Sequence, residues 1–136
     1  MPNDEQAIVT RYYELVTALI HKNSCVLNQI FAPTAILKCW NGEHYSKYQW
    51  IDLIQNEALT YLKFSTIGLP LISQQVATIK STVTLQGLTG ARGMLSQINF
   101  IKDDGNWTLT QQVLSKHDSS KKPIDNGLNR NWLNLK

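Results

Sequence analysis

No part of the chain limits the possible folds more than residues 31–42, FAPTAILKCWNG. A helix-type pattern ends at Pro33, because proline removes a backbone donor and clashes with the preceding turn. Strand-forming residues follow, and Asn41-Gly42 is typical of a two-residue type I′ hairpin turn. We therefore predict a strand at residues 34–40 that pairs with a short strand at residues 43–45.

Two helical patterns precede this segment. Residues 3–22 carry apolar side chains three and four positions apart, with acidic residues in the first turn, as in an amphipathic helix. A shorter helix follows, with Asn23 or Ser24 as its N-cap and Pro33 as its end. The sequence therefore predicts two helices before the first strand.

A third helix is predicted after the hairpin. Ser46 and Gln49 form an S-x-x-Q capping box, and apolar residues recur at helical spacing up to Leu62. We expect this helix to span residues 47–63. The Gly68-Leu69-Pro70 segment is expected to separate it from the sheet.

The rest of the core alternates with period two, which is typical of strands with one covered face. Strands are predicted at residues 74–87, 91–102 and 107–115, with turns at Leu88-Thr89-Gly90 and Asp103-Asp104-Gly105. The chain is thus expected to form an α+β fold in which three helices precede a curved antiparallel meander.

Size and charge indicate one domain and a tail. A chain of 136 residues with 43% apolar content suits a single core. We assign residues 1–115 to the domain and residues 116–136 to a polar tail that is either flexible or docked on a partner subunit. Much of the net charge of +3 lies in this tail, so the charge is weak evidence for an anionic partner.

Several classes of protein are disfavoured. No apolar run has the length of a membrane span, and the acidic start of the chain differs from a targeting peptide, so a cytoplasmic protein is expected. Cys25 and Cys39 lack the spacing of a disulfide framework or a zinc site, and no cofactor is expected. Basic residues do not form a stripe with aromatic residues, which argues against nucleic-acid binding.

The order of these elements resembles the nuclear transport factor 2-like superfamily, which includes ketosteroid isomerase and the SnoaL-like cyclases. The resemblance covers residues 4–115 and rests on FAPTAILKCWNG and on KDDGNWTL before the last strand. It implies a cystatin-like cone, with three N-terminal helices packed in the concave face of a curved, mainly antiparallel sheet and the first strand in a short hairpin. It also implies a homodimer formed through the sheet face.

The resemblance places an unusual residue where the isomerase-like members carry their catalytic base. An ungapped match puts Cys39 there, so the carboxylate needed for proton abstraction is absent. The family's oxyanion-binding tyrosine corresponds to Tyr12 or Tyr13, and its second acid falls on Ser96 or Gln97. This pattern argues against isomerase chemistry.

Polar residues that interrupt an apolar strand face are candidates for a cavity lining. Ser81, Ser96 and Gln111 are such interruptions, and with Tyr13 and Trp40 they form our predicted ligand-binding set. The alternative is that these side chains bond to neighbouring backbone or to buried water.

Two further residues are candidates for catalysis only. Cys39 would need a nearby base or cation to become a nucleophile, and packing as a small buried thiol is the simpler interpretation. His44 lies near the expected mouth of the cone, but an exposed hairpin position without a role is the more common case. No metal site is predicted, because neither residue has a suitable neighbour.

Three functional hypotheses follow. The first is a domain that binds an apolar or aromatic small molecule. The second is a protein-interaction or dimeric scaffold module that uses the sheet face or Trp132. The third is an isomerase, dehydratase or polyketide cyclase-like enzyme with atypical residues.

Overall fold

The computed structural model describes residues 4–87 and 92–116. This part of the chain forms three helices and six strands. They are α1 (Asp4–His21), α2 (Ser24–Ile30), β1 (Phe31–Lys38), β2 (His44–Ser46), α3 (Lys47–Gln55), β3 (Leu59–Ser73), β4 (Val76–Gly87), β5 (Arg92–Asp103) and β6 (Asn106–Lys116). Strand β6 includes Lys116, and the predicted turn at Leu88-Thr89-Gly90 and residues 117–136 of the predicted tail lie outside the described residues.

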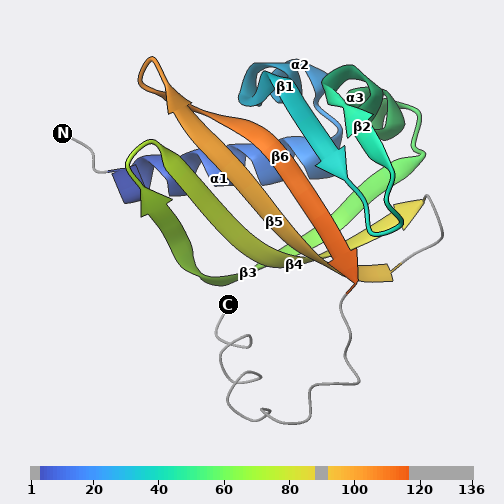
Figure 1. The fold of residues 1–136 in the computed structure, drawn as a ribbon. Helices are drawn as coiled ribbons and strands as arrows, with labels where there is room; N and C mark the ends of the chain where they lie inside the picture. The colour runs from blue at the N-terminus through green and yellow to red at the C-terminus, as the bar shows by residue number, and fades with distance from the viewer. Residues whose placement is uncertain (1–3, 88–91, 117–136) are drawn as a thin grey trace, which may run out of the picture.

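The strands form one curved sheet in the order β2-β1-β6-β5-β4-β3. All neighbouring strands are antiparallel except β1 and β6, which are parallel. Helix α1 crosses behind the sheet in Figure 1, and α2 and α3 cover one end of it. We call the side covered by α1 the inner face and the opposite side the outer face. This architecture confirms the predicted α+β cone.

The hairpin after β1 differs from the prediction. Cys39 N donates to Glu43 O at 2.9 Å, and Gly42 N donates to Cys39 O at 3.0 Å. Gly42 has φ of 90°, but Asn41 does not adopt the positive φ that a type I′ turn requires at both central positions. Residues 40–42 therefore connect the bonded pair Cys39 and Glu43, and the paired strands are β1 and β2 rather than residues 34–40 and 43–45.

The turn between β5 and β6 has the geometry that its sequence suggests. Asp104 and Gly105 have φ of 55° and 82°, and Asp103 pairs with Asn106 across the hairpin. Positive φ at both central positions is the requirement of a type I′ turn. The prediction of a tight connection here is confirmed.

The prediction of a helix over residues 47–63 is wrong. The capping box forms, since Ser46 N donates to Gln49 Oε1 at 2.9 Å, but α3 ends at Gln55. Glu57 adopts φ of 64°, which reverses the chain, and Tyr61 then pairs with Leu85 of β4. The apolar residues after Gln55 fit a helix or a strand by spacing alone, and pairing with β4 selects the strand.

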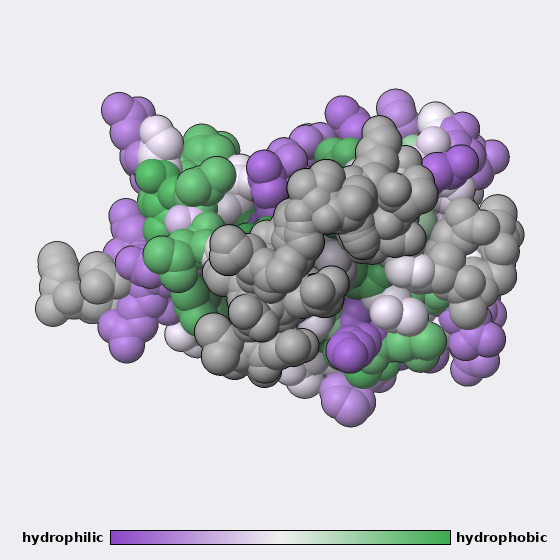
Figure 2. Space-filling view, turned by 90° about the horizontal axis from the view of Figure 1, so that it is seen from below, coloured by the Kyte–Doolittle hydropathy of each residue, from purple (hydrophilic) through white to green (hydrophobic). Residues whose placement is uncertain are grey.

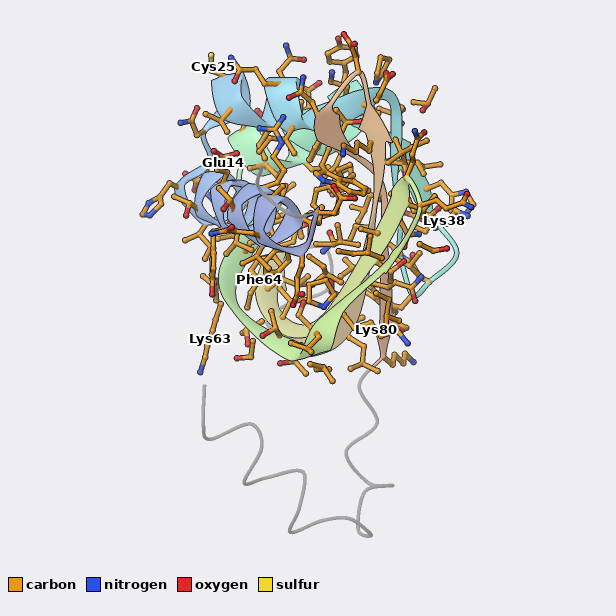
Figure 3. All side chains as sticks on the ribbon, turned by 90° about the vertical axis from the view of Figure 1, so that its left-hand side faces the viewer. Glu14, Cys25, Lys38, Lys63, Phe64 and Lys80 are labelled. Carbon is orange, nitrogen blue, oxygen red and sulfur yellow. The ribbon has the colours of Figure 1, made fainter. Side chains whose placement is uncertain are left out.

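The Gly68-Leu69-Pro70 segment also differs from its prediction, because it lies inside β3. The pairing of β3 with β4 shifts register between Ile67 and Leu71, and Gly68 has φ of 74°. This bulge bends the strand without ending it. Figure 3 shows β3 and β4 curling around the inner face below α1.

A second bulge decides which residues of β6 enter the core. Asn99 pairs with Gln111, but the next residue of β5, Phe100, pairs with Leu109, so Thr110 is the extra residue. Beyond this bulge the buried positions are Gln112 and Leu114. The prediction that Gln111 shares the apolar face of Leu109 is therefore wrong.

The helices contribute mainly apolar side chains to the core. One stripe of α1 is buried, and in α3 the ring of Trp50 packs 4.3 Å from that of Phe31 between centroids.

None of the helices in the described ranges combines the length and the apolarity that crossing a bilayer requires.

Candidate functional site

The structure brings two of the five predicted ligand-binding residues together. Ser81 of β4 and Ser96 of β5 are direct cross-strand partners on the inner face, and both are buried. Trp40 packs against the edge of the core in the β1–β2 loop. Tyr13 is 64% exposed on α1, and Gln111 lies outside the core face.

A chain of hydrogen bonds between buried side chains crosses the inner face and ends at Ser96. Trp50 Nε1 donates to the Tyr61 hydroxyl at 3.2 Å, and that hydroxyl donates to Gln112 Oε1 at 2.7 Å. Gln112 Nε2 then donates to Ser96 Oγ at 2.8 Å. We call these four residues the buried polar chain. It joins α3, β3, β6 and β5 and fixes the orientation of Ser96.

Ser81 and Tyr12 form a second polar feature beside this chain, which we call the hydroxyl pair. Both residues are buried, and neither hydroxyl has a hydrogen-bond partner at ordinary bonding geometry, although the two lie near enough for Ser81 to act on Tyr12. Burial raises the pKa of Tyr12 to about 12, an effect that the nearby Ser81 hydroxyl opposes and Tyr13 reinforces. Both hydroxyls are therefore neutral donors at physiological pH, and buried polar groups are normally hydrogen-bonded.

Aromatic rings surround the hydroxyl pair on the side of β3. Phe64 meets Tyr12 edge-on at 6.4 Å and stacks on Tyr61 at 5.6 Å, both measured between ring centroids. Figure 3 places Phe64 between α1 and the sheet. The inner face thus offers two hydroxyl donors next to an aromatic wall.

The most informative inner-face residues were not in the predicted set. Tyr12 occupies the buried stripe of α1 that includes Ile8, Leu15 and Leu19, so helical spacing alone favours it over Tyr13. Gln112 enters the core only because of the bulge at Thr110, for which the sequence carries no clear signal.

The environment of Cys39 does not activate its thiol. Burial, reinforced by the charge of Glu43, raises the pKa of Cys39 to about 11. Since the thiolate is the nucleophile, a raised pKa lowers reactivity at neutral pH. His44 is exposed on β2. In the part of the chain that the structure describes, no three His, Cys, Asp or Glu side chains gather as metal ligands.

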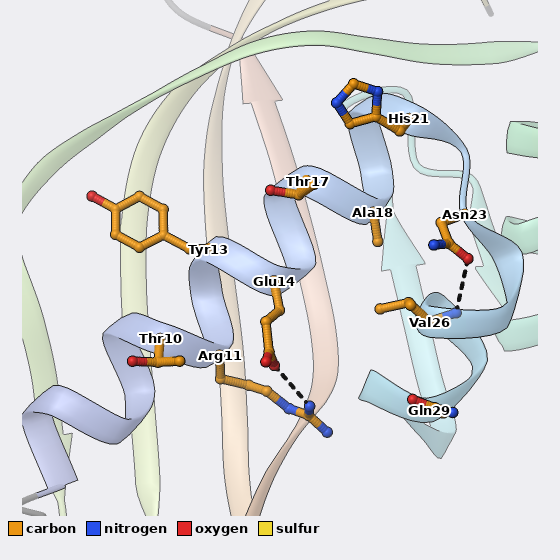
Figure 4. A pocket seen from close by; sticks show the side chains of 10 residues that line it. All are labelled: Thr10, Arg11, Tyr13, Glu14, Thr17, Ala18, His21, Asn23, Val26 and Gln29. Atoms are coloured by element: carbon orange, nitrogen blue, oxygen red, sulfur yellow. Dashed lines mark hydrogen bonds and ion pairs between the residues drawn. The ribbon is translucent and has the colours of Figure 1, made fainter.

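A groove of about 570 Å³ lies on the surface between α1 and α2 (Figure 4). Tyr13 lines this groove, together with an Arg11–Glu14 ion pair of 3.0 Å and His21. Arg11 is held in place because its Nε donates to Trp107 O at 2.9 Å. Tyr13 therefore belongs to a helix-surface groove and not to the inner face.

Comparison with known proteins gives a result for structure but not for sequence. No protein-family model matches the chain, and no curated protein matches it in sequence. Solved structures do match it. An NTF2-like protein from Cytophaga hutchinsonii has a TM-score of 0.75 and 13% identity, over 85% of this chain and 100% of that one.

Two further structures support the same fold. A putative Ca/calmodulin-dependent kinase II association domain from Exiguobacterium sibiricum has a TM-score of 0.73 and 10% identity, over 87% of this chain and 97% of that one. A Nostoc punctiforme protein of unknown function, described as having a cystatin-like fold, has a TM-score of 0.62 and 14% identity over 85% and 92%.

These matches define the class of protein to which the architecture corresponds, a cone of three helices and a curved sheet. The chain has the NTF2-like fold, also described as cystatin-like. At these identities the likeness establishes the fold and leaves the activity open, because this kind of fold carries many functions.

Proposed function

We propose that the protein binds a small apolar or aromatic molecule between α1 and the inner face of the sheet. The observation that carries this proposal is the hydroxyl pair, two neighbouring buried donors that have no partner at ordinary bonding geometry and lie beside the buried polar chain. Ligand sites in proteins combine apolar walls with a few converging polar groups. Tyr12, Ser81 and the ring of Phe64 match that description.

The protonation state of the pair indicates the kind of ligand. Tyr12 is protonated at physiological pH, and burial raises its pKa further, to about 12, while Ser81 is neutral. Both can donate to one oxygen, so a ligand with a carbonyl or ether oxygen on an aromatic body suits the site. The isomerase position holds Cys39, whose pKa is raised to about 11, so at neutral pH it is a protonated thiol that cannot accept a proton, and binding is favoured over catalysis.

Thermal denaturation tests this proposal on the full chain. We expect a panel of aromatic ketones and ethers to include compounds that raise Tm, since a ligand at 100 times its Kd adds about 2.7 kcal/mol to stability. The shift should shrink in Tyr12→Phe and in Ser81→Ala.

Tyr13→Phe is the matched control, because it removes the same hydroxyl from the next residue of α1, which is 64% exposed. Its ligand-induced shift should equal that of the wild type. If no compound of the panel raises Tm, binding at the inner face is contradicted. If only Tyr13→Phe abolishes the rise in Tm, binding at the inner face is also contradicted, and the site lies in the α1–α2 groove.

A second candidate function is that of a dimeric scaffold, and the outer face favours it. Half-buried polar residues form a network there, in which Thr78 Oγ1 bonds to Asn99 Oδ1 at 3.0 Å and Gln97 Nε2 donates to the same oxygen at 3.4 Å. Ordered polar side chains suit a symmetric, water-containing interface. A similar structure is named a putative association domain, although that name belongs to the other protein.

Light scattering at micromolar concentration tests the scaffold hypothesis. We expect a mass of two chains for the wild type and of one chain for Leu95→Arg, which introduces a charge on the outer face. Leu62→Arg, at a position 46% exposed on β3, should leave the mass unchanged. A wild-type mass of one chain would exclude the homodimer.

A further inference from the structure

Four apolar side chains remain exposed where β3 passes into β4. Leu69, Leu71, Val76 and Ile101 are 76%, 63%, 50% and 40% exposed, and we call them the apolar patch. Exposed apolar surface that is contiguous usually marks an interaction site. The question is what covers it.

Strand register shows that the patch is contiguous on the outer face. Val76 and Ile101 are direct partners between β4 and β5, so their side chains lie on the same face. Leu71 pairs with Thr78, two residues from Val76 on that face, and Leu69 lies in the adjacent bulge. Figure 2 shows hydrophobic side chains gathered on the left of the view, where β3 leads into β4 in Figure 1.

We propose that the apolar patch is covered by the C-terminal segment of the same chain, through Trp132, Leu133 and Leu135. This segment, NRNWLNLK, places three large apolar residues within four positions. A tryptophan and two leucines supply the apolar surface that four exposed aliphatic side chains require.

Charge favours the same occupant. Asp103 and Asp104 are exposed and follow Ile101 closely at the end of β5, whereas Lys102 is already paired with Asp4 at 2.9 Å. Arg130 and Lys136 flank the apolar residues of the C-terminal segment. Basic residues on either side of an apolar anchor complement a patch that has acidic residues at its border.

The length of the intervening chain is sufficient. The patch residue Ile101 lies seven strand positions from Met94, the partner of Lys116, which is about 23 Å at about 3.3 Å per residue. Residues 117–131 can span about 50 Å when extended. An unstructured chain of that length would have a root-mean-square span of roughly 20 to 24 Å, which matches the distance to the patch and would bring the effective concentration of the segment there near its maximum.

Limited trypsin digestion of the full chain tests this docking, because Arg130 adjoins the anchor and Lys121 does not. We expect cleavage after Arg130 to be roughly five- to tenfold faster in Leu71→Asp and in Trp132→Ala than in the wild type. A five- to tenfold protection of the wild type is expected when the effective concentration of the segment at the patch, which is on the order of millimolar, exceeds the Kd of docking five- to tenfold. Cleavage after Lys121 should not change.

Leu62→Asp is the matched control, because Leu62 is exposed on β3 outside the patch. It should leave cleavage after Arg130 at the wild-type rate. Equal rates in the wild type, Leu71→Asp and Leu62→Asp would overturn the proposal. Protection that weakens on dilution would overturn it as well, since a second copy and not the same chain would then occupy the patch.

Discussion

The two faces of the β4–β5 ladder both carry small polar residues, but these residues differ in whether their side chains are hydrogen-bonded. On the outer face Thr78 and Asn99 are cross-strand partners, and their side chains bond to each other at 3.0 Å. On the inner face Ser81 and Ser96 are also partners, but only Ser96 has a bond, which it accepts from Gln112. The face that has access to water satisfies its polar atoms, and the dry face leaves a hydroxyl unpaired.

This difference is informative because an unpaired polar group costs more where water is excluded. A buried donor without a partner costs about 1 to 3 kcal/mol, whereas an exposed donor can bond to solvent. The same hydroxyl chemistry is therefore structural on the outer face and indicates a site on the inner face. Three substitution pairs can break or sharpen this comparison.

The largest effect is expected for Gln112→Ala, compared with Gln111→Ala. Gln112 is fully buried and bonds both Tyr61 and Ser96, so its loss leaves the Tyr61 hydroxyl without an acceptor and Ser96 without its donor, and it opens a cavity. We expect the free energy of unfolding to fall by about 3 to 5 kcal/mol in urea titrations. Gln111→Ala should change it by less than about 0.5 kcal/mol. Equal losses would contradict the bulge at Thr110.

A smaller effect is expected from alkaline pH, compared between Tyr12→Phe and Tyr13→Phe. The pKa of Tyr12 is raised from 10.0 to about 12 in the folded state. Its contribution to stability is therefore complete below pH 10 and is lost as the pH rises to about 12, because the unfolded state releases the proton first.

Between pH 9 and pH 12 the wild type should therefore lose up to about 2 to 3 kcal/mol more stability than Tyr12→Phe, at 1.36 kcal/mol per unit. Burial also raises the pKa of Tyr61 and Cys39, but both shifts remain in each variant. Tyr13→Phe should lose nearly as much stability as the wild type, because Tyr13 is the smallest cause of the Tyr12 shift. Identical slopes for the two phenylalanine variants, measured by denaturant titration at each pH, would contradict the burial of Tyr12.

The smallest effect is expected for Ser81→Ala, compared with Thr78→Val. Removing an unpaired buried hydroxyl should leave the free energy of unfolding unchanged or raise it by up to about 1 kcal/mol. Thr78→Val removes a bond on the outer face and should lower it by about 0.5 to 1 kcal/mol. If Ser81→Ala is instead destabilising by more than Thr78→Val, its hydroxyl has a partner, such as a buried water.

Sequence reasoning succeeded where local rules are sufficient. The capping box of Ser46 and Gln49 forms, and the hairpin at Asp104-Gly105 has the φ values that its residues favour. The alternation along β4 placed Ser81 on the covered face, where it is fully buried. Each of these features depends on residues within a few positions of one another.

The candidate site was predicted only in part. Ser81 and Ser96 were identified correctly as inner-face residues, but Tyr13 and Gln111 each stand one position from the buried residue, Tyr12 and Gln112. The helical stripe of α1 contained the information needed for Tyr12. The sequence around Gln112 did not contain the corresponding information, because the extra residue at Thr110 changes which side chains of β6 face inward.

The sequence by itself determined the class of fold, the start of each helix and the alternating faces of β4 and β5, because these follow from backbone preferences and local spacing. Only the tertiary structure decided that residues after Gln55 form a strand and that Gln112 joins the buried polar chain. Strand pairing and bulges depend on partners far away in sequence, and one inserted residue reverses every later side chain.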